Sequence, residues 1–122
     1  MSKTILTVDD AAMMRKMICF TLKAVGHEVI EAPNGEEALR TMQDRQIDLV
    51  IADVNMPKMD GITLTRKLRA LPKYAHTPIV LLTKEDAADK MEEGRAAGAT
   101  GWIVKPFKQE QLLAAVTKFL SC

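Results

Sequence analysis

Three carboxylates, a hydroxyl and an ammonium each follow directly on a short apolar run of the sequence: Asp9, Asp10, Asp53, Thr83 and Lys105. If these runs are parallel strands of one sheet, the side chains meet at one edge, because open α/β sheets bind ligands at the carboxyl ends of their strands. Each residue alone has an ordinary explanation, such as a helix cap or a solvated surface side chain. Their shared place after apolar runs therefore predicts a single site.

This set of side chains suits metal-assisted phosphoryl transfer. Clustered carboxylates repel one another unless a cation lies among them, and Mg²⁺ is usually held by one or two carboxylates with phosphate and water. A carboxylate also acts as a nucleophile toward a phosphoryl group, whose oxygens then need cationic and hydrogen-bonding partners such as Lys105 and Thr83. Asp53 is the best candidate nucleophile because its strand is expected to be central. Asp9 and Asp10 are then left to serve the metal.

The elements that must position these residues alternate between strand and helix along the whole chain. Strands are expected over 5–8, 27–32, 47–52, 78–82 and 102–104, which are short and mostly apolar runs. Helices are expected over about 12–25, 35–45, 62–71 and 86–97, and a last helix shows Leu112, Leu113, Val116, Phe119 and Leu120 on one face. Because the strands do not alternate between apolar and polar residues, helices should cover both faces of an open parallel sheet.

Local signals mark where several helices begin and end. Gly26 and Gly98 are expected to end the first and fourth helices, and Asn34 with Glu37 three residues later reads as a helix N-cap. The first helix is expected to bury the side chains of Met14, Ile18, Thr21, Leu22 and Val25 on one face. The eight methionines are expected to fill the core, among them Met13, Met14 and Met17.

Composition and length favour one soluble domain over residues 1–122, with 48% hydrophobic residues to build its core. The formal net charge of +1 gives no general reason to expect nucleic acid or an anionic membrane as a partner. Two cysteines, Cys19 inside a helix and Cys122 at the end, give no disulfide framework and suit a cytoplasmic protein. No apolar run approaches the roughly 20 residues that span a bilayer, and the first residues lack a signal-peptide layout.

The motifs around the predicted site resemble those of the receiver domains of bacterial response regulators. They are Val8-Asp9-Asp10, Asp53 followed by Asn55-Met56-Pro57 and Asp60-Gly61, Leu82-Thr83, and Lys105-Pro106-Phe107. The resemblance covers essentially the whole chain and is strongest to the single-domain chemotaxis regulators of the CheY type. It implies a flavodoxin-like three-layer (βα)5 sandwich with the strand order 2-1-3-4-5, for which flavodoxin and CheY are known examples.

The resemblance also implies the roles of the site residues. Asp53 would be the phosphoacceptor, Lys105 would contact the phosphoryl oxygens, and Thr83 would be the switch hydroxyl. Mg²⁺, or Mn²⁺ in its place, would be bound through Asp10, Asp53 and the main-chain carbonyl of Asn55, with Asp9 reached mainly through water. The peptide between Lys105 and Pro106 is expected to be cis, which orients the lysine.

Two residues depart from the usual family pattern. Trp102 stands where the switch aromatic is commonly tyrosine or phenylalanine, so both an inward rotation on activation and a static contact aromatic stay open. Lys84 follows Thr83 where a small residue is common, and it is either a solvated lysine or, with Glu85, a modulator of phosphoryl loss. The family implies that the face formed by the fourth helix, the fifth strand and the fifth helix binds partners.

The expected function is that of a stand-alone phosphoacceptor and not of a true enzyme, because it catalyses only its own phosphorylation and dephosphorylation. A CheA-like histidine kinase would donate the phosphoryl group to the monomer, and the output would be a protein such as the flagellar motor switch. No DNA-binding segment follows Cys122, so no nucleic acid is expected.

Other functions stay open at this point. Within the family, a phosphorelay shuttle or a phosphate sink is the alternative to motor control. A flavodoxin-like electron carrier shares the fold, although Asp9 and Asp10 would repel the cofactor phosphate. A phosphatase with an aspartyl intermediate would need a lid, for which the chain is short.

Overall fold

Five strands form one parallel sheet in the order β2-β1-β3-β4-β5, which is the order that the family resemblance implies. The structure, a computed structural model, describes residues 3–84 and 88–120. The strands are β1 (Thr4–Val8), β2 (Glu28–Ala32), β3 (Leu49–Asp53), β4 (Ile79–Lys84) and β5 (Gly101–Lys105). Each strand pairs in parallel with its neighbour, so all five carboxyl ends lie at the same edge of the sheet.

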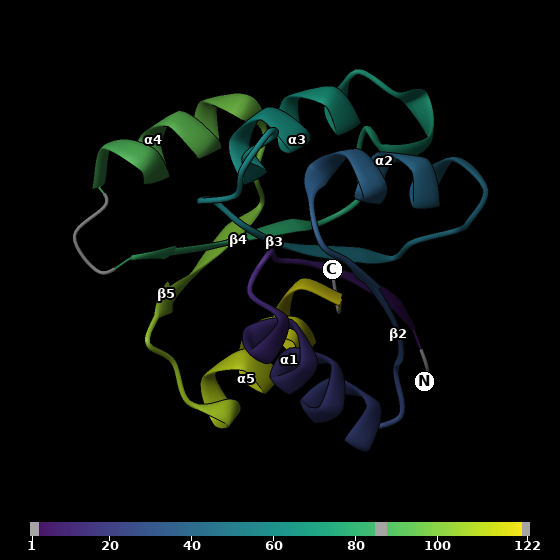
Figure 1. Cartoon of the computed structure of the whole chain (residues 1–122), viewed down its shortest axis with the longest axis vertical. Helices are drawn as coiled ribbons and strands as arrows, with labels where there is room; N and C mark the ends of the chain where they lie inside the picture. The colour runs from purple at the N-terminus through teal and green to yellow at the C-terminus, as the bar shows by residue number, and fades with distance from the viewer. Residues whose placement is uncertain (1–2, 85–87, 121–122) are drawn as a thin grey trace.

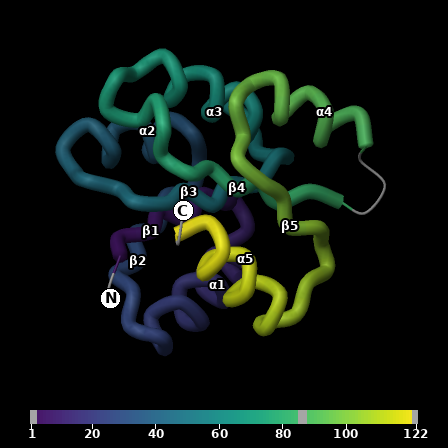
Figure 2. The backbone as a smooth tube through the Cα atoms, turned by 180° about the vertical axis from the view of Figure 1, so that it is seen from behind, coloured from purple at the N-terminus to yellow at the C-terminus, as the bar shows by residue number. Residues whose placement is uncertain are grey.

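Helices cover both faces of this sheet and complete the three-layer, flavodoxin-like arrangement (Figure 1). They are α1 (Ala12–Ala24), α2 (Gly35–Gln43), α3 (Gly61–Arg69), α4 (Ala88–Ala97) and α5 (Gln109–Leu120). The view from behind shows α1 and α5 together on one face and α2, α3 and α4 on the other (Figure 2). Each face has its own apolar core, and no helix in the described part of the chain is long and apolar enough to cross a membrane.

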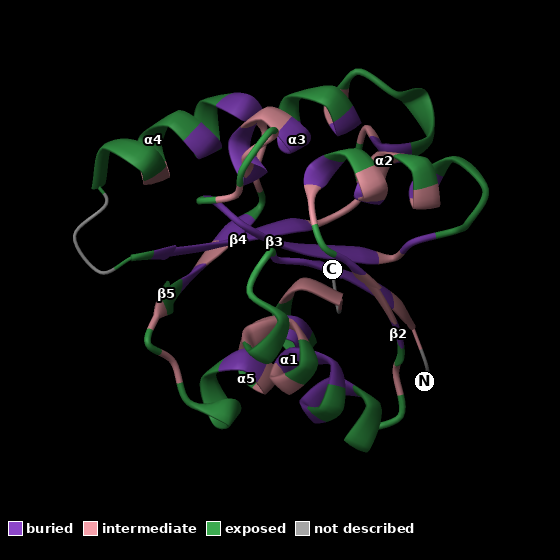
Figure 3. Cartoon of the chain, in the orientation of Figure 1, coloured by how far each residue is buried: buried purple, intermediate pink, exposed green. Residues whose placement is uncertain are grey.

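The three inner strands of the sheet, β1, β3 and β4, are almost entirely buried, because helices cover both faces of the sheet (Figure 3). All five residues of β3 are buried, which confirms that this strand is central. The few buried polar side chains include three of the predicted site residues, Asp9, Asp53 and Thr83. Burial of these groups carries a free-energy cost unless each finds a partner.

The local signals are confirmed at most helix ends. The Asn34 side chain accepts a hydrogen bond from the Glu37 amide at the start of α2. Gly26 and Gly98 have φ angles of +96° and +110°, which are the left-handed conformations that let glycine end a helix. Cys19 is buried as expected, whereas Cys122 lies outside the described residues.

Two predictions about the core are wrong. Val25 is 54% exposed because α1 ends before it, and Met13 is 87% exposed because it lies on the solvent side of α1. A short 3₁₀ helix, η1 (Pro72–Tyr74), lies between α3 and β4 and was not predicted from the sequence. Tyr74 in η1 is buried, and its hydroxyl donates to the carbonyl oxygens of Met42 and Arg45, at the amino edge of the sheet.

Candidate functional site

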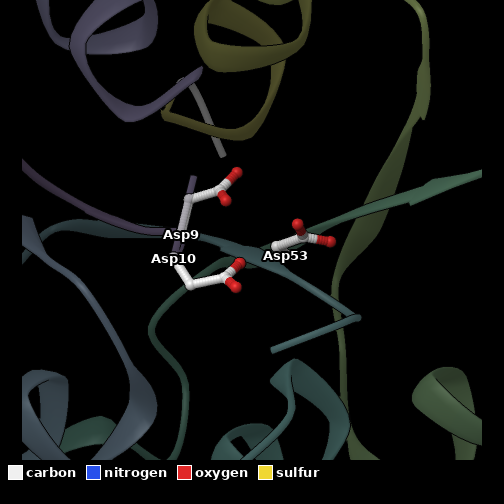
Figure 4. A group of neighbouring side chains, drawn as sticks. All are labelled: Asp9, Asp10 and Asp53. Carbon is white, nitrogen blue, oxygen red and sulfur yellow. The ribbon is translucent and has the colours of Figure 1, made fainter. Parts of the chain in front are cut away.

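Three aspartates meet where the strand order reverses. Asp9 and Asp10 follow β1, and Asp53 ends the adjacent strand β3. Ligand-carrying oxygens of the three side chains lie within 4.8 Å of one another, and Figure 4 shows the side chains grouped at the ends of the two strands. This edge is the topological switch point, where α/β sheets of this order bind their ligands.

Lys105 reaches this acidic cluster from the end of β5. Its Nζ atom lies 2.8 Å from Asp53 Oδ2 and 3.9 Å from Asp9 Oδ2. The Lys105–Pro106 peptide is cis, as predicted. The lysine side chain is partly shielded from water, so its ion pair with Asp53 offsets part of the repulsion among the acids.

The loop after β3 holds Asp53 from the backbone side. The Asn55 amide donates to Asp53 Oδ1 at 3.1 Å, so both carboxylate oxygens of Asp53 have a partner. Asp60 caps α3 by accepting from the Thr63 amide. A side chain at Gly61 would collide with the Asp53 carbonyl oxygen, so glycine is required for α3 to begin so close to the nucleophile candidate.

Asp9 is the least compensated of the three acids. Its side chain is fully buried, and its Oδ2 atom has no hydrogen-bond partner among the described residues. Burial is the main cause that raises the pKa of Asp9 above its ordinary value of 3.8, and the negative charges of Asp53 and Asp10 add to it. The hydrogen bond from the Ala11 amide and the positive charge of Lys105 lower this pKa, but they do not cancel the rise. A buried carboxylate oxygen that accepts no hydrogen bond from the described residues and lies beside two other carboxylates fits a hard divalent cation such as Mg²⁺.

The remaining predicted residues lie around this cluster. Thr83 follows the strand partner of Asp53 on β4, and its buried hydroxyl has no partner within residues 3–84 and 88–120. Lys84 is exposed at the end of β4 and is the strand partner of Lys105. Glu85 lies outside the described residues.

Trp102 packs against α4 in this structure. The half-buried ring lies over Gly94, where an added Cβ would collide with the indole. The missing side chain at Gly94 thus makes room for a ring larger than the tyrosine or phenylalanine that the family resemblance leads one to expect. Sequence analysis missed this role of Gly94, because only the packing of β5 against α4 brings the two residues together.

A profile described as the response regulator receiver domain matches residues 5–117, which is nearly the whole chain. The chain is a response regulator receiver domain. Receiver domains are phosphoacceptor signalling modules that work with histidine kinases, and they are not enzymes with a separate substrate. Family membership therefore removes the electron-carrier and phosphatase alternatives.

Named relatives agree with this assignment. A chemotaxis protein CheY homologue of Campylobacter jejuni is 38% identical over 110 residues, covering 88% of this chain and 85% of the relative. The structure of the chemotaxis protein CheY4 of Vibrio cholerae has a TM-score of 0.93 and 42% identity, covering 98% of this chain and 99% of that one. The chain spans only 52%, 13% and 48% of three longer regulatory proteins that it also matches.

A third solved structure bears on the acidic cluster. The receiver domain of the sensor histidine kinase PA1611 from Pseudomonas aeruginosa is 26% identical, with a TM-score of 0.91 over the full length of both chains, and it has a magnesium ion coordinated in its active-site cleft. The cluster of Asp9, Asp10 and Asp53 is typical of such a magnesium-binding receiver site.

The raised pKa of Asp9 predicts how stability depends on pH in the metal-free protein. The folded state binds this proton more tightly than the unfolded state, so the free energy of unfolding falls as pH rises from 3.8 to the raised pKa. Asp9→Asn removes that loss and should raise the free energy of unfolding at neutral pH by about 1 kcal/mol. Urea denaturation in EDTA at acidic and neutral pH measures it. Asp44→Asn, at an exposed site, is the control, and an equal pH slope in wild type and Asp9→Asn would contradict the prediction.

The packing of Trp102 on Gly94 generates a second prediction. Gly94→Ala should displace the indole toward solvent, because the added Cβ has no room beside the ring. Tryptophan emission should shift to the red and acrylamide should quench it more strongly. Ala96→Ser, at an exposed position of the same helix, should leave both properties unchanged. If Gly94→Ala gave the wild-type emission spectrum, the Trp102 ring would not pack over Gly94 in the folded protein.

Proposed function

We propose that residues 1–122 form one receiver domain that acts as a stand-alone response regulator of the CheY type in the cytoplasm, phosphorylated on Asp53 by a CheA-like histidine kinase. The observation that carries this proposal is the position of Lys105 Nζ, 2.8 Å from an oxygen of Asp53 and beside two further aspartates. It puts a nucleophile and a fixed positive charge at one point of the sheet edge.

The proposed step is a phosphoryl transfer. An oxygen of the Asp53 carboxylate forms a P–O bond while the P–N bond of the donor phosphohistidine breaks, and the imidazole leaves. Before the transfer Lys105 is paired with the Asp53 carboxylate, and after it the ammonium would bind the phosphoryl oxygens. This change of partner needs no large movement of the lysine, because its side chain already contacts Asp53. The Asn55 amide keeps the carboxylate oriented during the attack.

Asp9, Asp10, Asp53 and the carbonyl of Asn55 are proposed to hold Mg²⁺ or Mn²⁺ for this step. When bound, the ion would neutralise carboxylate charge and stabilise charge on the phosphoryl oxygens. The buried Asp9 Oδ2 atom, which has no hydrogen-bond partner in the described part of the chain, supports this assignment. Oxygen ligands of this kind are the ones that hard divalent cations prefer.

Thr83 and Trp102 are proposed to carry the signal from the site to the face made by α4, β5 and α5. The Thr83 hydroxyl is buried and unsatisfied in the described structure, so a phosphoryl oxygen on Asp53 would give it an acceptor. An open pocket of about 290 Å³ lies between β5 and α5, and it is lined by Trp102, Ile103, Val104, Phe107, Gln111 and Ala115. This pocket is the proposed contact for an output protein such as the flagellar motor switch, which the monomer would bind without nucleic acid or membrane.

Asp53→Asn is the direct test of the proposal. The amide keeps the shape of the side chain but is not nucleophilic, so labelling by a small phosphodonor such as acetyl phosphate should be lost while the far-ultraviolet circular dichroism spectrum is retained. Asp10→Ala should lose most labelling at low Mg²⁺ because a metal ligand is missing. Asp44→Asn, away from the site, is the control. Full labelling of Asp53→Asn would reject this phosphoacceptor, and phosphotransfer from candidate kinases would then separate motor control from a relay or sink role.

Lys84 generates a second prediction, on how long the phosphoryl group survives. Its side chain is exposed, and its backbone position pairs with that of Lys105 on the neighbouring strand, so we propose that its apolar stem shields the group from attacking water. Lys84→Ala should lose the phosphoryl group about threefold faster or more, where tenfold corresponds to about 1.4 kcal/mol.

The decay of labelled protein after donor removal, at fixed Mg²⁺, measures this effect. Lys67→Ala is the matched control, because Lys67 is an exposed lysine of α3. Decay of Lys84→Ala at the wild-type rate or below it would make Lys84 a solvated surface residue only. Glu85, the other proposed modulator, can be tested by the same assay.

A further inference from the structure

The loop between β1 and α1 carries two of the three acids, Asp9 and Asp10. α1 follows an N-cap residue, Ala11, whose side chain makes no capping hydrogen bond, and alanine is a poor N-cap. The exposed Asp10 carboxylate makes no hydrogen bond or ion pair with any described residue. The position of the Asp10 side chain is therefore set by the backbone beside it.

Arg15 provides an anchor for this backbone. Its Nη1 atom donates to the Asp9 carbonyl oxygen at 2.7 Å, and its Nε atom donates to Glu31 Oε1 at 3.1 Å. Lys16 contacts the other oxygen of Glu31 at 3.1 Å but does not reach Asp9. Only 15% of the Arg15 side chain is exposed, so water competes little for its hydrogen bonds.

The hydrogen bond from Arg15 fixes the peptide that joins Asp9 to Asp10, because a peptide group is planar and its oxygen defines that plane. The same residue is held on its other side, since the Asp9 amide donates to the Ala32 carbonyl oxygen at 3.1 Å. Its side chain is held as well, because Asp9 Oδ1 accepts from the Ala11 amide at 2.9 Å. Among these contacts, the hydrogen bond from Arg15 is the one that holds the carbonyl of Asp9, the group through which the chain continues to Asp10.

We infer that Arg15 is a positioning residue of the metal site: by holding the Asp9 carbonyl, it aims the Asp10 carboxylate at the divalent cation. This inference rests on the proposed function, because it concerns the proposed magnesium site. Glu31 on β2 holds the guanidinium in turn. Arginine suits this position because its planar fork reaches two acceptors at once, which a single lysine nitrogen does not.

The direction in which Mg²⁺ affinity changes when Arg15 is removed distinguishes a positioning role of Arg15 from a purely electrostatic one. If Arg15 acted only as a positive charge near the acids, its removal would tighten Mg²⁺ binding, because a competing cation is lost. If Arg15 positions Asp10, its removal weakens Mg²⁺ binding although a positive charge has gone. Residues that orient metal ligands typically change affinity by about tenfold or more.

The experiment is calorimetric titration of the unphosphorylated full chain with Mg²⁺, repeated with Mn²⁺ by electron paramagnetic resonance. Arg15→Ala should raise the dissociation constant for Mg²⁺ about tenfold. Lys16→Ala, which removes the same charge one residue away, should change it less than about twofold, because an exposed charge is largely screened by salt. Arg15→Lys keeps the charge and most of the packing and should be intermediate. At saturating Mg²⁺, Arg15→Ala should regain most of its phosphorylation rate.

Equal or tighter Mg²⁺ binding by Arg15→Ala would overturn the inference. Urea denaturation checks that each variant is folded. If Arg15→Ala is not folded, the Mg²⁺ affinity of Arg15→Lys is the test, and a wild-type affinity of that variant would also overturn the inference. Asp10→Ala is titrated in parallel. Unchanged Mg²⁺ affinity of Asp10→Ala would mean that the proposed metal site itself is misplaced, which is a different failure from that of Arg15.

Discussion

Repulsion among three carboxylates at the end of a parallel sheet is the constraint on which the rest of this structure depends. Asp9, Asp10 and Asp53 are held within 4.8 Å of one another although like charges at such distances oppose folding. A fully apolar sheet would be more stable at this edge. The fold keeps the acids together by covering both faces of the sheet with helices, so that the strands that carry them are packed too tightly to move apart.

Hydrogen bonds and ion pairs offset only part of the repulsion among the three carboxylates, and they do so unequally from one acid to the next. Asp53 has Lys105 and the Asn55 amide on its two oxygens, whereas Asp9 has one buried oxygen that lacks a hydrogen-bond partner in the described residues and lies 3.9 Å from Lys105 Nζ. The opposite edge of the sheet shows the contrast, because there the buried Tyr74 hydroxyl has two backbone carbonyl oxygens, of Met42 and Arg45, within hydrogen-bond distance. The amino edge is thus built for stability. The carboxyl edge retains buried polar atoms, Asp9 Oδ2 and the Thr83 hydroxyl, that have no hydrogen-bond partner in the described residues.

The sequence was sufficient for those features that depend on local pattern. Short apolar runs predicted the strands, Asn34, Gly26 and Gly98 predicted helix ends, and the acids after the runs predicted which side chains meet. Contacts made by side chains that do not lie at the carboxyl ends of the strands were not predicted. Arg15 has no signal beyond being a basic residue of a helix, and its reach to the Asp9 carbonyl exists only once α1 lies beside β2. The exposure of Met13 was mispredicted for the same reason, since residue type alone does not say which side of α1 faces the sheet.

The pairing of Asp53 with Lys105 also has a consequence for a chain that is still being synthesised. The two residues are 52 positions apart, so the ribosome adds the lysine about 3–10 s after the aspartate at ordinary elongation rates of roughly 5–20 residues per second. During that interval the nascent chain contains all three acids without the ammonium that offsets them. An interrupted translation product that ends before β5 therefore lacks both the pairing charge and the edge strand of the sheet.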